Sequence, residues 1–180
     1  DRYGKRLGLE LWQASLDAVD LVERIVVEER IDCGHTRPGS AALGFTERDR
    51  RSFAEKAAWM KDHLGFPLEV VSGEAMHTVI GSDRFPVALV DGFSAGCDPA
   101  RYQYGLARSA TRAGAALIEQ AEVISIEPRH AGFELVTTRG WLRAGEVLLA
   151  TNGYTGTWLP ELRRRVVPIG SYIVTTEPLP

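Results

Sequence analysis

The sequence predicts an α/β fold of the mixed α+β kind, and two observations carry this prediction. Apolar residues recur at helical spacing in several segments before residue 115, for example between Leu7 and Ile31. From about Val123 onward the apolar residues alternate at a period of two, which is typical of short strands. The composition agrees, since 44% of the 180 residues are hydrophobic and 25% are charged, as expected for a globular protein with a sizeable core.

Three helices are expected in the first part of the chain, and two of them have clear start signals. Thr46 and Asp98 are good N-caps, because their side-chain oxygens can accept hydrogen bonds from free N–H groups of the first turn. Pro99 suits the first turn of the third helix. Glycines that can end each helix follow the apolar stripes. The expected helices span residues 7–31, 47–65 and 99–113.

Short strands and turns fill the rest of the chain. Ser72 is expected to start a short helical turn, and Arg139-Gly140 is a plausible hairpin turn between two strands. A further short helix is expected over residues 159–165. The expected strands span residues 38–45, 85–90, 115–119, 123–127, 133–138, 141–144, 146–151 and 166–176.

The segment from Val147 to Thr155 is the most informative for function. Its apolar run ends in small residues and then in Asn152-Gly153, a pair that readily adopts positive φ. We expect a buried strand whose carboxyl end opens into a tight turn. In open α/β sheets, ligands bind just beyond such strand ends. From the residues alone, a plain turn is the competing interpretation.

Several classes of function are excluded or disfavoured. A net charge of −3 gives no support for a nucleic-acid partner, and no apolar stretch is long enough for a membrane span. The four histidines have no partners at metal-ligand spacing, so no metal site is expected. Cys33 and Cys97 are interpreted as reduced, buried thiols of a cytoplasmic protein. The dinucleotide fingerprint GxGxxG does not occur.

Five blocks, in order, resemble the D-amino-acid-oxidase-like family of FAD-dependent oxidoreductases, and within it the γ-glutamylputrescine oxidase and glycine oxidase branch. The likeness covers nearly the whole chain. The blocks are ERIDC at 29–33, PARYQYGLA at 99–107, GAALIE at 114–119 followed by Val123, LATNGYT at 149–155, and VVPIGSYIVTTEPL at 166–179.

The resemblance implies a doubly wound flavin-binding domain interleaved with a mixed-sheet substrate domain. Residues 1–31 and 98–165 would belong to the flavin domain, and residues 32–97 and 166–180 to the substrate domain. The family's valine contact to adenine would correspond to Val123. Its small-residue turn would correspond to Ala150, Thr151 and Asn152 with Gly153, and Tyr154 stands where relatives often place a tryptophan near the flavin. No catalytic residue can be assigned.

The resemblance also implies an FAD-dependent enzyme that oxidises the C–N bond of a small amine or amino acid to an imine. The family's N-terminal βαβ unit with GxGxxG is not found in these residues, and both ends look like cuts. We therefore expect the isolated segment to bind FAD weakly or not at all, and an uncovered sheet edge could support a homodimer. The alternative is a non-catalytic remnant or binding module without flavin. The residues upstream of Asp1 would separate the two, since a strand followed by GxGxxG supports the enzyme.

Overall fold

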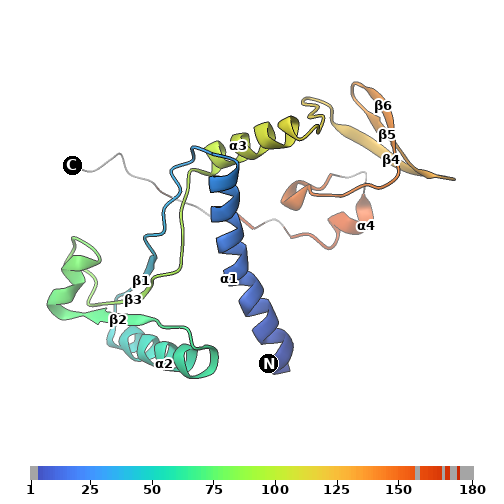
Figure 1. The fold of residues 1–180 in the computed structure, drawn as a ribbon. Helices are drawn as coiled ribbons and strands as arrows, with labels where there is room; N and C mark the ends of the chain where they lie inside the picture. Colours follow the sequence, from blue (N-terminus) through green and yellow to red (C-terminus); the bar gives the residue numbers. More distant parts are fainter. Residues whose placement is uncertain (1–3, 157–158, 168, 171–173, 175–180) are drawn as a thin grey trace. The chain divides into compact units, whose positions relative to one another are not determined.

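The computed structural model describes residues 4–156, 159–167, 169–170 and 174. The chain folds as two compact units, Asp1–Ala116 and Leu117–Pro180 (Figure 1). Both units mix helices with antiparallel sheet in the described residues, which confirms the expected mixed fold class.

The first unit contains three α-helices and a small sheet. The helix α2 packs against β2 and β3, so one face of the sheet is covered. In order, the elements are α1 (Gly4–Glu28), β1 (Ser40–Gly44), α2 (Glu47–Leu64), β2 (Glu69–Ser72), the 3₁₀ helix η1 (Gly73–Thr78), β3 (Val87–Asp91) and α3 (Pro99–Arg112).

The sheet of the first unit has the order β1-β3-β2, with both pairs antiparallel. The central strand β3 is the most buried, because Val87 and Ala88 are 0% exposed. Ala88 forms a core cluster with Val71 from β2 and Met76 from η1. The η1 turn therefore stabilises the sheet through an apolar contact, while its expected N-cap, Ser72, makes no side-chain capping bond.

The starts of α2 and α3 confirm the N-caps expected at Thr46 and Asp98, and the end of α1 corrects one expected boundary. Thr46 and Asp49 form a capping box, and Asp98 accepts from the N–H groups of the first turn of α3. The helix α1 ends at Glu28, three residues earlier than expected. Arg30 adopts φ +53, its N–H donates to Val27, and the N–H of Ile31 donates to Val26. This is a Schellman motif with an arginine where glycine is usual.

Two irregular segments of the first unit run side by side between the helices and the small sheet (Figure 1). Thr36 and Gly96 exchange two backbone hydrogen bonds of 2.9 Å. The N–H of Asp98 donates to the carbonyl of Cys33 at 2.8 Å. We call these paired segments, residues 33–36 and 96–98, the neck. It joins the helices α1 and α3 to everything folded between them.

The second unit is built on a β-meander. Its strands are β4 (Val123–Arg129), β5 (Gly132–Thr137) and β6 (Gly140–Ala144), in the order β4-β5-β6. Glu134 in β5 accepts from Arg129 at 2.8 Å and from Arg143 at 3.3 Å, so one carboxylate ties the three strands together. Hydrogen bonding from Arg129 is the main reason that the pKa of Glu134 is lowered. After the meander come a 3₁₀ turn, η2 (Asn152–Tyr154), and α4 (Pro160–Arg163).

Two expected strands are wrong. Residues 115–119 and 146–151 adopt no strand, and Leu117, Ile118 and Leu148 are 55%, 63% and 91% exposed. Both are apolar runs of the kind that forms central strands, but a strand exists only when neighbouring backbone pairs with it. No such neighbour occurs for either run in the described residues. The expected strand over 166–176 lies mainly outside the described residues, and residues 166, 167, 169, 170 and 174 are not in a strand.

The described part of the chain shows neither a membrane-spanning helix nor a cluster of metal-ligating side chains. None of its helices combines the length and the apolar character needed to cross a bilayer. It also contains no cluster of three or more histidine, cysteine, aspartate or glutamate side chains suited to a metal ion.

Candidate functional site

Val123, the expected adenine contact, is the first residue of β4, which is an edge strand of its sheet. It pairs with Thr137, and the N–H of the next residue, Thr138, donates to the carbonyl of Glu122 at 2.9 Å. In an antiparallel ladder this pattern makes Val123 and Thr137 a non-hydrogen-bonded pair. The N–H and C=O of Val123 therefore point away from β5, toward the open edge of β4.

The expected small-residue turn lies in the same unit. Ala150 and Thr151 are exposed and irregular, and Asn152 opens η2 with φ +49, the left-handed conformation predicted from Asn-Gly. The Thr151 and Thr155 hydroxyls lie 2.9 Å apart, and Thr155 Oγ1 donates to the Asn152 carbonyl at 3.0 Å. These two bonds close the turn on itself. The tight turn is confirmed, while the buried strand expected to lead into it is wrong.

Of the residues expected to contact the flavin, the structure brings those of the turn together but does not link Val123 to them. Thr151 and Asn152 share the closed turn, and Gly153 is half-buried within it. Tyr154 is 93% exposed. No hydrogen bond of the described residues connects Val123 with the turn.

These residues fit one side of a bound FAD. The outward-facing N–H and C=O of Val123 match the paired donor and acceptor positions on the edge of an adenine ring. Ala150, Thr151 and Gly153 carry small side chains, so a cofactor could approach the backbone closely. The 180-residue sequence contains no glycine-rich loop that opens a helix in the manner of a dinucleotide fingerprint, the usual source of N–H groups for a pyrophosphate.

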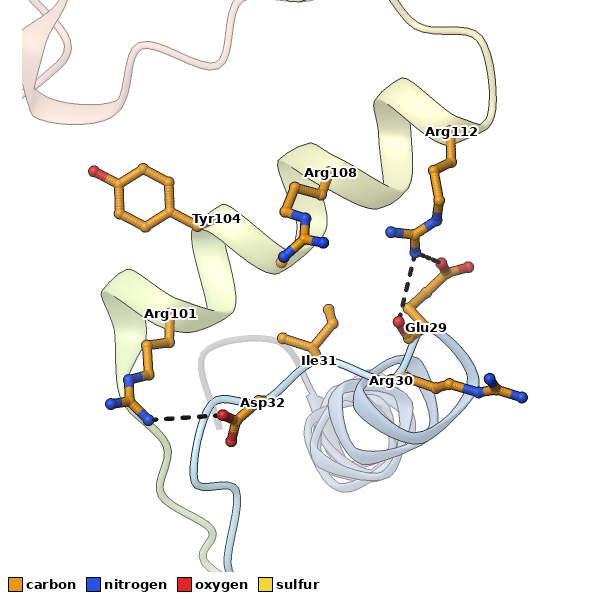
Figure 2. Close-up of a pocket in the computed structure, with 9 residues that line it drawn as sticks. Glu29, Arg30, Ile31, Asp32, Arg101, Tyr104, Arg108 and Arg112 are labelled. Atoms are coloured by element: carbon orange, nitrogen blue, oxygen red, sulfur yellow. Dashed lines mark hydrogen bonds and ion pairs between the residues drawn. The ribbon is translucent and has the colours of Figure 1, made fainter.

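A second feature is an open cavity of about 340 Å³ in the first unit, where the end of α1 meets α3 (Figure 2). Ile31 forms its floor and lies against Gly105, where even a methyl group would come within 3.1 Å of the Ile31 Cβ. Charged side chains surround this contact. The lining residues are Glu29, Arg30, Ile31, Asp32, Arg101, Tyr104, Gly105, Arg108 and Arg112.

The charges of this cavity are largely paired with one another. Arg112 donates to the Glu29 carboxylate at 2.8 Å, and Arg101 lies 4.0 Å from the Asp32 carboxylate (Figure 2). Hydrogen bonding from Ser109, followed by that from Arg112, lowers the pKa of Glu29. These ion pairs therefore hold the end of α1 against α3. The clearest role of the charged residues around the cavity is to stabilise this contact between the two helices.

Sequence reasoning missed this arginine-lined surface. Arg101, Arg108 and Arg112 are spaced by seven and four residues, which places them on one helix face without forming a run. The periodicity of basic residues along α3 would have been the signal.

Comparisons with known proteins agree with the fold and with the resemblance. The family described as FAD dependent oxidoreductase matches residues 2–180. The chain is 27% identical to a probable oxidoreductase OrdL of Haemophilus influenzae, over 99% of this chain and 43% of that protein. It is 26% identical to the gamma-glutamylputrescine oxidoreductase of Escherichia coli, over 98% of this chain and 41% of that protein.

Solved structures show the same fold. Glycine oxidase from Geobacillus kaustophilus superposes with a TM-score of 0.72 at 21% identity, over 88% of this chain and 43% of that one. Glycine oxidase from Bacillus cereus gives a TM-score of 0.73 at 18% identity, over 86% of this chain and 44% of that one. The chain belongs to the family of FAD-dependent oxidoreductases that includes the D-amino-acid oxidases, and it spans less than half the length of these relatives.

Proposed function

We propose that the protein containing this chain oxidises the C–N bond of a small amine or amino acid to an imine. The observation that carries the proposal is the match to the FAD-dependent family along residues 2–180. It is supported by the similarity to a gamma-glutamylputrescine oxidoreductase, whose name indicates an amine substrate. FAD, when bound, supplies the acceptor for the two electrons that leave the substrate.

The proposed role of this chain is to form the adenosine side of the flavin site. Val123 would offer its free backbone groups to the adenine edge, and Ala150, Thr151, Asn152 and Gly153 would allow close approach along the turn. Both features depend on backbone position more than on side-chain chemistry. The exposed ring of Tyr154 could add an apolar contact, since no other described group covers it.

The proposal also covers the compartment and the partners of the protein. The two free cysteines favour a reducing compartment, and we propose the cytoplasm. Nothing in the charge of the chain favours a nucleic-acid partner. A homodimer through an open sheet edge is a further proposal, which sedimentation of the full-length protein would test.

The full-length protein tests the proposed function directly. It should be purified with flavin absorbance and lose that absorbance without oxygen when the correct amine or amino acid is added. The change Ala150→Leu should weaken FAD retention at least tenfold, because the larger side chain blocks approach to the turn. Ala131→Leu is the matched control, since Ala131 is also exposed and lies in the β4–β5 turn of the same unit.

The alternative is a binding module without flavin. It would be supported if the full-length protein is colourless, takes up no added FAD and is unaffected by Ala150→Leu. The isolated 180-residue chain is expected to retain little or no FAD on desalting. A yellow isolated chain would contradict our view that groups outside it are needed for the pyrophosphate.

A further inference from the structure

The two cysteines meet at the neck of the first unit, although they stand far apart in the sequence. The Cys33 carbonyl accepts from the N–H of Asp98 at 2.8 Å, and that N–H belongs to the peptide group that follows Cys97. A disulfide requires Cα atoms about 4.4–6.8 Å apart. The backbone hydrogen bond between groups adjacent to both Cα atoms keeps the two residues close to each other.

The side chains of the two cysteines are also neighbours. Burial raises the pKa of the Cys97 thiol, and the Cys33 side chain beside it raises that pKa further. Both thiols are free in the structure. The raised pKa lowers the fraction of Cys97 present as thiolate, so we expect its reaction with peroxide to be slow.

The two cysteine side chains differ in how accessible they are to solvent. Cys33 is 0% exposed, whereas Cys97 is half-buried and lines a cavity of about 150 Å³. The cavity is mostly apolar, but His35 also lines it, and the His35 Nε2 is buried without a hydrogen-bond partner among the described residues. A small neutral oxidant such as hydrogen peroxide fits this space and would meet Cys97 first.

We propose that Cys33 and Cys97 are a modification site that peroxide converts into a reversible intramolecular disulfide across the neck. The Cys97 sulfur attacks one peroxide oxygen and the O–O bond breaks. This gives a sulfenic acid and a hydroxide, which takes the thiol proton and leaves as water. The Cys33 sulfur then attacks the Cys97 sulfur and the S–O bond breaks. A second water leaves with the Cys33 proton, so two thiols lose two electrons and peroxide gains them.

The consequence is a covalent link between the segments that follow α1 and precede α3. The boundaries expected between flavin-domain and substrate-domain pieces fall at 31–32 and 97–98, beside these cysteines. If those boundaries are correct, the disulfide would fix the hinge between the two domains. The bond itself depends only on the first unit and is independent of the proposed oxidoreductase activity.

The test treats the reduced full-length protein with hydrogen peroxide, blocks the remaining thiols, and maps the peptides without reduction. We expect a linked peptide pair carrying Cys33 and Cys97, lighter by about 2 Da than the two reduced peptides because two hydrogens are lost. Dithiothreitol should restore both thiols. The oxidised protein should melt at a higher temperature than the reduced one, because the bond closes a long loop.

Two variants keep the proposal falsifiable. Cys97→Ser should keep the Cys33 thiol intact in peroxide, since Cys33 is buried, and its melting temperature should not rise. Cys33→Ser should stop at a Cys97 sulfenic acid that dimedone traps. If Cys33→Ser fails to fold, the wild-type map and Cys97→Ser still decide. The proposal is overturned by unreacted Cys33 and Cys97 in the wild type, by links between chains, or by over-oxidised Cys97 without the linked pair.

Discussion

The contact between Gly105 and Ile31 allows a prediction in which two general effects oppose each other. Replacing glycine by alanine inside a helix normally stabilises a protein by up to about 1 kcal/mol. At position 105, however, the new Cβ would lie 2.9 Å from Ile31 Cγ1 and 3.1 Å from Ile31 Cβ, with Cγ2 closer still. Ile31 is 8% exposed and β-branched, so rotating its side chain cannot remove all three contacts.

We therefore expect Gly105→Ala to destabilise the first unit. Overpacking of this kind costs about 1–3 kcal/mol, which equals or exceeds the helix-propensity gain of about 1 kcal/mol. Gly8→Ala in α1 is the matched control, because nothing lies within 4 Å of its new Cβ. The propensity gain cancels between the variants, so their difference isolates the clash at about 1–3 kcal/mol.

The assay is urea unfolding of both variants, followed by the helical circular dichroism signal. In a protein of this size each kcal/mol also shifts Tm by about 2–4 °C. The double variant Gly105→Ala with Ile31→Ala should lose less stability than the sum of the single changes, because removing Cγ1 and Cγ2 relieves the clash. Equal stabilisation by Gly105→Ala and Gly8→Ala would refute the packing of α3 on Ile31.

Other changes test the helix ends. Asp98→Ala should lower the free energy of unfolding in urea by about 1 kcal/mol, since the N–H groups of Ala100 and Arg101 lose their acceptor. Asp98→Asn keeps an acceptor oxygen and should lower the free energy of unfolding much less. Arg30→Gly should stabilise by about 0.5–1 kcal/mol, because glycine adopts the positive φ of this position without strain, and a loss with this variant would count against the Schellman motif. Hydrogen bonding from Thr46 lowers the pKa of Asp49. A lowered carboxyl pKa stabilises the fold at pH values above the unfolded-state pKa. The difference in free energy of unfolding between wild type and Asp49→Asn should therefore be full at neutral pH and shrink as the pH falls through and below about 4. A difference that stays constant from pH 7 to pH 3 would contradict this.

The elements that the sequence predicts well are those whose partners are close along the chain. Thr46 with Asp49, and Asp98 with Pro99, specify helix starts within one turn, and the structure has both. The meander β4–β6 also needs only its own neighbours, because short turns bring the three strands together. In each case the interacting groups can be recognised from a few adjacent residues.

Most of the failures depend on partners that are distant in the sequence, and the end of α1 is a local exception. The runs 115–119 and 146–151 have strand-like residues, but backbone pairing with segments remote in sequence decides whether they become strands. The end of α1 was misplaced because an arginine, and not a glycine, takes the left-handed position at residue 30. The proximity of Cys33 to Cys97, and of Ile31 to Gly105, likewise could not be read from spacing. For the candidate flavin contacts, the turn at Asn152 could be predicted, whereas the open backbone groups of Val123 required the register of β4 on β5.

The neck has a consequence for how the first unit could have been assembled. Because Thr36 and Gly96 are paired, the polypeptide leaves the helical part and returns to it at nearly the same point. Everything between them is therefore an insertion at a single place, with its own sheet and its own buried cluster. Insertions whose two ends are adjacent can be exchanged or removed with little strain on the host. The lobe between Thr36 and Gly96 is thus an insertion with adjacent ends, and the contact of Trp12 in α1 with Phe66 is what its removal would expose.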